Sequence, residues 1–537
     1  MKKSNKFRHI IMVVLTLFLV MSMTACGNNH NQENDTNHTN NTDTLNIGVS
    51  GSISTLDINQ EAGILNYYIS ALVGEGLVGI NNNGQITAGL AQRWYTDDYI
   101  TWSFIVGDNS MFSDGSPVTI DDIIWSIERA MDPLQSPGVA LHFPADIQAI
   151  TKVSDTQLDI VLSEPTPGFI WAVSNVAGLS VTSKAWAEHA DSIGSPQDLL
   201  LGSGPFQVIE FSPGSHVILE AQDYWRESDS RSEQGNIRRI RFDFITDDAT
   251  RLLAFTQGSI DFALNIPIEQ SEQWEAVDGA QVDFYADRSY YGLTLDVTHP
   301  PFDNEYVRQA VAYSVNAAGI VNSVLRGNAT VATAITPPEQ FASAIDIEEA
   351  RTLLADVTHF TYNLERAQKA FDQSGVATFE TTIYYPDSFP SVGQASLVIA
   401  DSLTQIGIIT NVVEIPIDQW LAEIGSNQGI AWMILFATTA QPQDMVTWLL
   451  SAAGPGSNPA NFADEEIARL MANVVTEPAE AGIDDLIKAH DLAQAQAIYV
   501  PVWWGQAASA WNRNIAVSDF NSYTLLSQNW VQHFTLQ

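Results

Sequence analysis

Residues 300–318 carry the clearest hydrophobic pattern in the chain. Two prolines precede Asp303 and Asn304, which are helix-capping residue types, and small or apolar residues then recur at helical spacing. Asn316 is placed to cap a second helix, whose apolar positions lead to a stop at Gly327. The pattern predicts two packed helices joined by a tight corner.

Strand and helix patterns alternate over most of the chain. Before residue 265 the predicted strands are 45–49, 101–106, a hairpin over 206–221, 237–244 and 260–264, and the predicted helices are 66–77, 119–131 and 247–257. After residue 360 the predicted helices are 364–374, 392–406, 418–424, 464–475 and 484–499, and the predicted strands are 379–385, 410–415, 431–437 and 500–504. This alternation predicts two α/β regions.

The length of 537 residues is too great for one ordinary core, so roughly two to four domains are expected. The first 26 residues resemble a bacterial lipoprotein signal: a basic start, a short apolar run, and small residues before Cys26. In this interpretation residues 1–25 are a signal peptide that is removed, and Cys26 carries the lipid. An uncleaved anchor and an ordinary secretory signal are the alternatives, and all three predict export.

Residues 26–44 are rich in asparagine and almost free of apolar side chains, which predicts a tether without a core. Two histidines, His30 and His38, lie in this segment, and we interpret them as polar filler rather than a metal-binding tail. Cys26 is the chain's single cysteine, which excludes internal disulfides and cysteine-based zinc sites.

Acidic residues outnumber basic ones by 63 to 23, and the net charge is -40. Removing residues 1–25 takes away four basic and no acidic residues, which moves the net charge to -44. Such a charge repels nucleic acids and anionic membrane surfaces, so nucleic acid is excluded as a partner. It also keeps an exported protein soluble and monomeric, which is the simpler explanation of the excess.

The sequence shows no catalytic pattern. It has no G-x-S-x-G elbow, no H-E-x-x-H, no phosphate loop and no dinucleotide fingerprint, and no two of its ten histidines lie at helical metal-ligand spacing. Acid pairs for glycoside cleavage could be drawn among 63 carboxylates, but this abundance makes any chosen pair uninformative. We predict no catalytic residues, no bound metal and no cofactor.

Several motifs carry a family resemblance. Residues 112–133, FSDGSPVTIDDIIWSIERAMDP, are similar to a signature F-x-D-G-x-P-x-T-A-x-D-V-x-x-S-x-x-R, residues 201–225 to a G-T-G-P-Y segment ending in Tyr-Trp, residues 300–310, PPFDNEYVRQA, to a P-F-D-N-x-x-V-R-Q-A block, and residues 362–375 to the helix that follows it. These blocks belong to the family 5 extracellular solute-binding proteins of ABC importers, the oligopeptide, dipeptide and nickel binding group. The chain resembles that family over nearly its whole mature length.

The resemblance implies an α/β fold of the periplasmic-binding-protein-like type II class, with two lobes around a hinged cleft and an accessory domain. Lobe I would comprise residues 45–79, 196–290 and 505–537, the accessory domain residues 80–195, and lobe II residues 291–504. Ligand in the cleft would stabilise the closed form, which the membrane permease then reads.

The resemblance also points to segments that would contact the ligand, and to a departure from the family pattern. Peptide binders of the family hold the ligand's amino group with an acidic residue at the position of Thr438, and a threonine cannot neutralise an ammonium group. Asp387 or Asp444 could supply the missing acid, whereas residues 384–390 lack the arginine that dipeptide binders use for the carboxylate. The expected ligand-binding residues are Ser52, Ile53, Ser54, Tyr384, Tyr385, Ser388, Trp420, Trp432, Thr438 and Thr439.

The function that these observations favour is capture of an extracellular solute, oligopeptides first, by a lipid-anchored protein that delivers it to permease subunits. The same scaffold binding a metal chelate or another small solute is the second hypothesis. A secreted acidic hydrolase and a surface adhesin or chaperone are hypotheses from other classes. Turnover of a substrate, lost on replacing a carboxylate pair, would distinguish the hydrolase from the binding protein.

Overall fold

The computed structural model describes residues 43–140, 147–225, 236–424, 429–451 and 457–537. The signal peptide over 1–25, the lipidation site Cys26 and the tether up to residue 42 were predicted for a part of the chain outside these residues. Within them, no helix combines the length and the apolar character needed to cross a membrane.

One large mixed sheet runs through the described residues, in the order β15-β14-β16-β12-β17-β11-β1-β10-β9-β8, and β13 pairs with β17. Its strands are β1 (Thr44–Val49), β8 (Phe206–Ser212), β9 (His216–Ala221), β10 (Arg239–Phe244), β11 (Phe262–Ala263), β12 (Gln281–Leu295), β13 (Thr330–Val331), β14 (Phe379–Pro386), β15 (Ile408–Ile415), β16 (Ile430–Leu435) and β17 (Tyr499–Trp511). Parallel pairs β1–β10 and β14–β15 lie in its two halves, which confirms two α/β regions.

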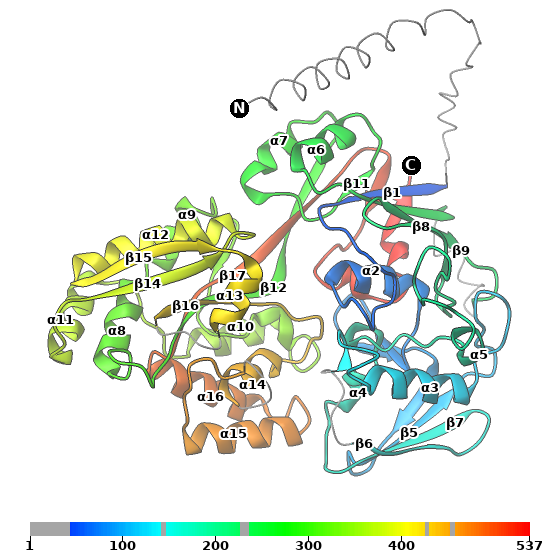
Figure 1. Cartoon of the computed structure of the whole chain (residues 1–537), viewed down its shortest axis with the longest axis horizontal. Helices are drawn as coiled ribbons and strands as arrows, with labels where there is room; N and C mark the ends of the chain where they lie inside the picture. The colour runs from blue at the N-terminus through cyan, green and yellow to red at the C-terminus, as the bar shows by residue number, and fades with distance from the viewer. Residues whose placement is uncertain (1–42, 141–146, 226–235, 425–428, 452–456) are drawn as a thin grey trace, which may run out of the picture. The chain divides into compact units, whose positions relative to one another are not determined.

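The two halves of this sheet are joined by β12 and β17, which pair antiparallel and run side by side as the longest strands in Figure 1. Only the first part of β17 was predicted, as residues 500–504, and β12 was not predicted. We call β12 and β17 the crossing strands. They carry the chain from one α/β region into the other and back.

Three smaller sheets complete the strand content of the described residues. They contain β2 (Val78–Ile80) with β3 (Ile86–Ala88); β4 (Ala91–Tyr95), β5 (Thr101–Val106), β7 (Gln157–Leu162) and β6 (Ile147–Lys152); and β18 (Ile515–Val517) with β19 (Phe534–Leu536). The four-stranded sheet shares one apolar cluster with α3, and that cluster also includes Tyr67, Ala440 and Tyr523 from other parts of the chain.

Most helices begin at the capping residues that the sequence offers. The helices are α2 (Ile64–Val73), α3 (Ile120–Met131), α4 (Phe169–Ala172), α5 (Lys184–Ala187), α6 (Asp248–Thr256), α7 (Ser271–Glu275), α8 (Glu305–Ser314), α9 (Ala317–Ser323), α10 (Ile347–Ala355), α11 (Leu364–Ser374), α12 (Pro390–Gln405), α13 (Ile417–Ile424), α14 (Asp444–Leu450), α15 (Glu465–Thr476) and α16 (Ile483–Ala495). Thr119 and Asp122 form the full capping box of α3, and Asn363 caps α11.

The predicted corner of two helices is confirmed as α8 and α9. Asn304, rather than Asp303, caps α8, and Asn316 caps α9 through the backbone N–H of Gly319. The face of α8 that carries Val307, Ala310 and Val311 is completely buried in the largest apolar cluster, whose members all lie between Tyr290 and Trp504. α8 is therefore a scaffold helix of the second α/β region.

Several predicted bounds were wrong for local reasons. α2 ends at Val73 instead of residue 77, because the backbone is already extended at Gly74. β16 ends at Leu435 instead of residue 437, because Leu435 pairs with Tyr290 at the point where β12 becomes irregular. α16 ends at Ala495 instead of residue 499, because Ala497 has a left-handed φ of 51°, which closes the helix before β17 begins.

Candidate functional site

A cavity of about 720 Å³ lies between residues from two distant stretches of the chain. One wall comes from α4 and from Tyr67 of α2, and the other comes from residues 435–448. Its lining is Ala62, Tyr67, Thr166, Gly168, Phe169, Trp171, Ala172, Ala177, Leu435, Phe436, Ala437, Thr438, Thr439, Gln441, Gln443, Asp444, Met445, Thr447, Trp448 and Val475. We call this the aromatic cavity. Its volume is within the range of small-molecule sites.

Aromatic residues from both walls line this cavity. Phe169 and Trp171 come from α4 and Phe436 and Trp448 from the other wall. The two rings of α4 are largely buried, at 1% and 6% exposure, whereas Phe436 is 59% exposed, an unusual fraction for a phenylalanine that follows a buried strand. The Phe436 ring is therefore the one most available to a ligand.

Residues 436–443, which we call the cavity loop, connect β16 to α14 and are held by their carbonyl groups. The Arg288 guanidinium donates to the Thr438 carbonyl at 3.2 Å, the Ser343 hydroxyl to the Ala440 carbonyl at 2.5 Å, and the Thr336 hydroxyl to the Pro442 carbonyl at 3.0 Å. Every second carbonyl is thus fixed by a side chain from outside the loop. This arrangement orders a segment that has no regular secondary structure of its own.

Asp444, at the start of α14, is the one ionisable acid in the lining. Its carboxylate accepts a hydrogen bond from the Thr439 hydroxyl. Burial raises the pKa of Asp444 from its ordinary value of 3.8 to about 6, although the hydrogen bond from Thr439 works in the opposite direction. The lining residues include no lysine, arginine or histidine, so the carboxylate faces the cavity without a basic side chain among them.

This combination defines what the cavity is able to bind. A carboxylate in apolar surroundings attracts a positively charged group, and aromatic faces stabilise such a group further through their quadrupoles. The hydroxyls of Thr438 and Thr439 and the amides of Gln441 and Gln443 add neutral hydrogen-bonding groups. The cavity therefore suits a ligand with an ammonium group and apolar parts.

Of the ten residues expected to bind the ligand, Thr438 and Thr439 line the aromatic cavity. The structure places the first-region loop elsewhere: Ser52 is exposed, Ile53 lies in an apolar cluster with 3% exposure, and the backbone N–H of Ser54 donates to the Glu61 carboxylate at 2.9 Å. None of these three residues lines the cavity.

The second-region residues divide between a strand end and the core. Tyr384 and Tyr385 are half-buried at the end of β14, the Tyr385 hydroxyl donates to Glu414 at 2.8 Å, and Ser388 is exposed in the following turn. Trp420 and Trp432 are 5% and 0% exposed, and Trp432 donates to the Ser396 hydroxyl at 2.7 Å. The structure thus places both tryptophans in the core rather than in the cavity lining.

Sequence reasoning did not select several of the lining residues. Tyr67, Phe169 and Trp171 lie far from the cavity loop in sequence, and they reach it only through the fold. Trp448 was not among the expected binding residues either, although its spacing four residues after Asp444 on α14 was an available signal. Among the described residues, no group of three or more His, Cys, Asp and Glu side chains could hold a metal ion.

Comparisons with known proteins agree with this architecture. The model of the family described as "Bacterial extracellular solute-binding proteins, family 5 Middle" matches residues 85–458. The chain is 24% identical over 430 residues to the probable D,D-dipeptide-binding periplasmic protein DdpA of Escherichia coli K12, covering 79% of this chain and 78% of that protein. It is 22% identical over 482 residues to the glutathione-binding protein GsiB of the same strain, covering 87% and 90%.

Solved structures show the same fold. The ABC transporter-associated periplasmic binding protein DppA from Helicobacter pylori, in complex with the peptide STSA, superposes with a TM-score of 0.74 at 19% identity, covering 92% of this chain and 98% of that one. NikZ from Campylobacter jejuni, in complex with Ni(L-His), gives a TM-score of 0.72 at 18% identity, covering 92% and 99%. The predicted type II periplasmic-binding-protein-like fold class is confirmed.

Proposed function

Because this chain belongs to the family 5 bacterial extracellular solute-binding proteins, we propose that it captures oligopeptides in the aromatic cavity and delivers them to the permease of an ABC importer. The observation that carries the proposal is the cavity itself, whose two walls come from α2 and α4 on one side and from residues 435–448 on the other. A ligand that contacts both walls stabilises the conformation in which the walls are close. The proposed partners are the peptide and the permease subunits, and the proposed state is a monomer.

The division into lobes remains part of this proposal. We assign residues 45–79, 196–290 and 505–537 to lobe I, residues 80–195 to an accessory domain, and residues 291–504 to lobe II. The largest apolar cluster, confined to Tyr290–Trp504, supports the last of these. The crossing strands β12 and β17 would then contain the hinge, since they connect the two α/β regions.

The charge of the cavity favours peptides that keep a free amino group. Asp444 would take the role of the acid that is missing at Thr438, since its carboxylate lies in the same cavity and has no basic partner among the lining residues. A charge-assisted hydrogen bond from an ammonium group to this carboxylate would orient the amino end of the peptide. The aromatic rings would contact its side chains.

A metal chelate is the second candidate, and the similarity to NikZ favours it. The described residues offer no cluster of metal ligands, so the protein would bind a chelate that arrives already formed, through its organic part. An acidic hydrolase remains a third and more distant alternative. Its signature would be turnover of a bound compound.

We expect isothermal titration calorimetry to show saturable binding of the peptide Ser-Thr-Ser-Ala to the purified mature chain. D-alanyl-D-alanine, reduced glutathione and nickel with L-histidine form the rest of the panel, and N-acetylated Ser-Thr-Ser-Ala is the matched control without an ammonium group. Binding of the free peptide at least about tenfold tighter than the acetylated one is expected from loss of a charged hydrogen bond.

Three results would contradict this proposal. Preference for the nickel complex over every peptide would favour the chelate. Equal binding of the free and the acetylated peptide would show that Asp444 does not bind the ammonium group. Cleavage of a panel member would indicate an enzyme. Mass spectrometry of the gently purified protein provides an independent check, because a tightly bound natural ligand would copurify.

The proposed anchor is tested separately from the ligand. We infer that residues 1–25 are a lipoprotein signal, that Cys26 is lipidated, and that the predicted tether over 26–44, whose last residue Thr44 already belongs to β1, connects the folded part to the outer face of the membrane. Replacing Cys26 with alanine is therefore expected to move most of the protein from the membrane fraction to the soluble exported fraction, measured by fractionation and immunoblotting. An unchanged membrane fraction would indicate a different mode of attachment.

A further inference from the structure

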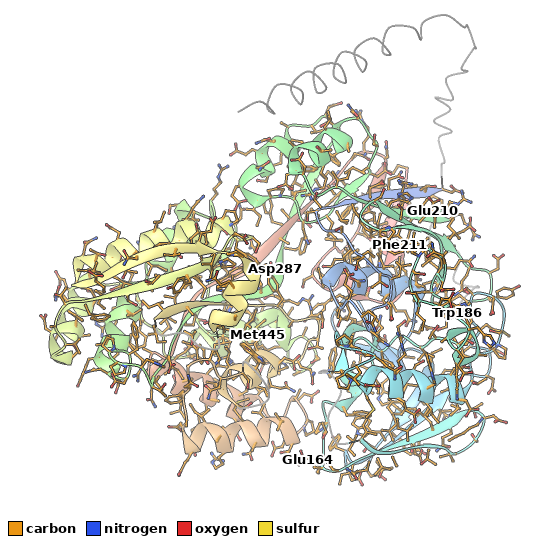
Figure 2. The ribbon with its side chains drawn as sticks, viewed as in Figure 1. Glu164, Trp186, Glu210, Phe211, Asp287 and Met445 are labelled. Atoms are coloured by element: carbon orange, nitrogen blue, oxygen red, sulfur yellow. The ribbon has the colours of Figure 1, made fainter. Side chains whose placement is uncertain are left out.

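Arg288 lies where the pairing of the crossing strands is interrupted. The regular register of β12 with β17 breaks over Asp287–Ser289, and Arg288 has a φ of 63°, in the left-handed region that residues other than glycine seldom adopt. On the facing strand, a Cβ added to Gly505 would lie 2.0 Å from the Ser289 hydroxyl oxygen, so a larger residue there would displace the Ser289 and Asp287 side chains. Figure 2 marks Asp287 at this place.

This backbone geometry directs the Arg288 side chain between two distant segments. One terminal nitrogen donates to the Thr438 carbonyl of the cavity loop at 3.2 Å, and the other donates to the Ser522 carbonyl at 3.0 Å. The guanidinium also lies 4.2 Å from the centre of the Tyr523 ring. Because Arg288 is only 3% exposed, these contacts are made in a desolvated environment.

The other two side chains that hold the cavity loop have a narrower reach. Ser343 and Thr336 bind the carbonyls of Ala440 and Pro442, and both come from the same α/β region as the loop. Arg288 differs because its second hydrogen bond is to residue 522, in the chain segment that follows β17. It therefore connects the crossing strands, the cavity loop and the C-terminal segment at one point.

Arg288 has no close ion pair. Among the described residues no carboxylate lies within salt-bridge distance of it, although the neighbouring buried Asp287 carboxylate interacts with its charge, and its Nε has no hydrogen-bond partner there. A buried guanidinium held by two carbonyls and a ring is costly compared with an apolar residue, so stability alone does not account for it. The planar fork does, however, hold two carbonyls in one fixed geometry, whereas the donors of a lysine ammonium rotate freely around a single nitrogen.

We propose that Arg288 is a positioning residue that holds the cavity loop in register with the C-terminal segment across the crossing strands. While this link is intact, the cavity loop and residues 518–527 move together. A rearrangement of the crossing strands is then transmitted to the wall of the cavity, and a change at that wall is transmitted back. This coupling between segments does not depend on which ligand the cavity takes.

Hydrogen–deuterium exchange of the ligand-free mature chain tests the link directly. In Arg288→Gln, amide exchange is expected to rise about tenfold or more in both residues 436–444 and residues 518–527, because both segments lose a charged hydrogen bond. Arg288→Lys keeps the positive charge but not the fork, so it should restore little of this protection.

Two variants provide matched controls. Ser343→Ala removes a different support of the cavity loop and should raise exchange in residues 436–444 alone. Arg308→Gln removes a guanidinium that is 4% exposed and bound to three carbonyls of the second region, so it should leave both segments unchanged while lowering overall stability. The proposal would be overturned if Arg288→Gln showed wild-type exchange or a rise in only one of the two segments. It would also be overturned if Arg288→Lys restored full protection, or if Arg308→Gln gave the same response as Arg288→Gln.

Discussion

Replacing Asp444 with asparagine is expected to stabilise the fold at neutral pH and at the same time to weaken binding of ligands that carry an ammonium group. The stabilisation follows from the raised pKa of about 6. In the unfolded chain this carboxyl has its ordinary pKa of 3.8, so the folded state binds a proton more readily than the unfolded state. Ionisation of Asp444 above pH 6 therefore costs folding free energy.

The sign and size of this effect define a pH window. Below pH 3.8 both states are protonated and the substitution should be neutral, whereas above pH 6 the full penalty applies. At 1.36 kcal/mol per pKa unit, asparagine should raise the free energy of unfolding by about 3 kcal/mol at pH 7.5 and by about 1 kcal/mol at pH 4.5. Tyr523, whose pKa burial raises to about 12, stays neutral throughout this range.

Urea unfolding at the two pH values measures the stability of the Asp444→Asn variant, and calorimetry with Ser-Thr-Ser-Ala measures its binding. Binding is expected to weaken about tenfold or more at pH 7.5, since a charged hydrogen bond is lost. Asp387→Asn is the matched control: this acid is exposed in the turn after β14, and both quantities should stay unchanged.

A variant that is less stable at pH 7.5 would show that the Asp444 carboxylate is satisfied in the folded state and that its pKa is not raised. A variant with unchanged peptide affinity would show that the acid does not contact the ligand. The two results are independent, because the first concerns the empty cavity and the second the occupied one.

Elements with strong local signals were predicted closely from the sequence. β5 and α11 have the predicted bounds, and the capping box of α3 and the caps of α8 and α9 lie at or beside the predicted residues. Caps and helical spacing act within a few residues, so a sequence displays them directly.

The crossing strand β12 was missed because its structure depends on distant partners. It pairs with β17, more than 200 residues later in the chain, and Asp287, Arg288 and Ser289 interrupt its pattern at the point where the register shifts. A 15-residue strand with three polar residues at a bulge has no clean alternation. Strand pairing between remote segments is decided by the whole fold.

The candidate site likewise contains residues that the local sequence indicates and residues that only the fold brings together. Thr438, Thr439 and the alternative acid Asp444 could be selected from the sequence, because the family resemblance marks that segment. Phe169 and Trp171 could not, since nothing in their own neighbourhood indicates that α4 faces the cavity loop. Nor does spacing distinguish Trp432, which is buried in β16, from Trp448, which lines the cavity.

Substitutions at Trp432 and Phe436 test the difference between an aromatic residue of the core and one that lines the cavity. Trp432 is completely buried, packs 5.3 Å from Trp503 between ring centres and donates a hydrogen bond to Ser396, so Trp432→Ala leaves a large void and removes a satisfied donor. It is expected to lower the free energy of unfolding by about 3–5 kcal/mol. Phe436→Ala removes a ring that is 59% exposed and should change stability by less than about 1 kcal/mol.

Binding is expected to respond in the opposite way. Phe436→Ala removes one of the rings that line the cavity and should weaken Ser-Thr-Ser-Ala binding severalfold, whereas Trp432→Phe, which keeps most of the buried volume, should bind the peptide normally. Urea unfolding and calorimetry on the three variants measure both quantities. Loss of binding in Trp432→Phe with a stable fold would show that Trp432 contributes to the ligand site after all. Normal binding in Phe436→Ala would show that the peptide does not contact this wall of the cavity.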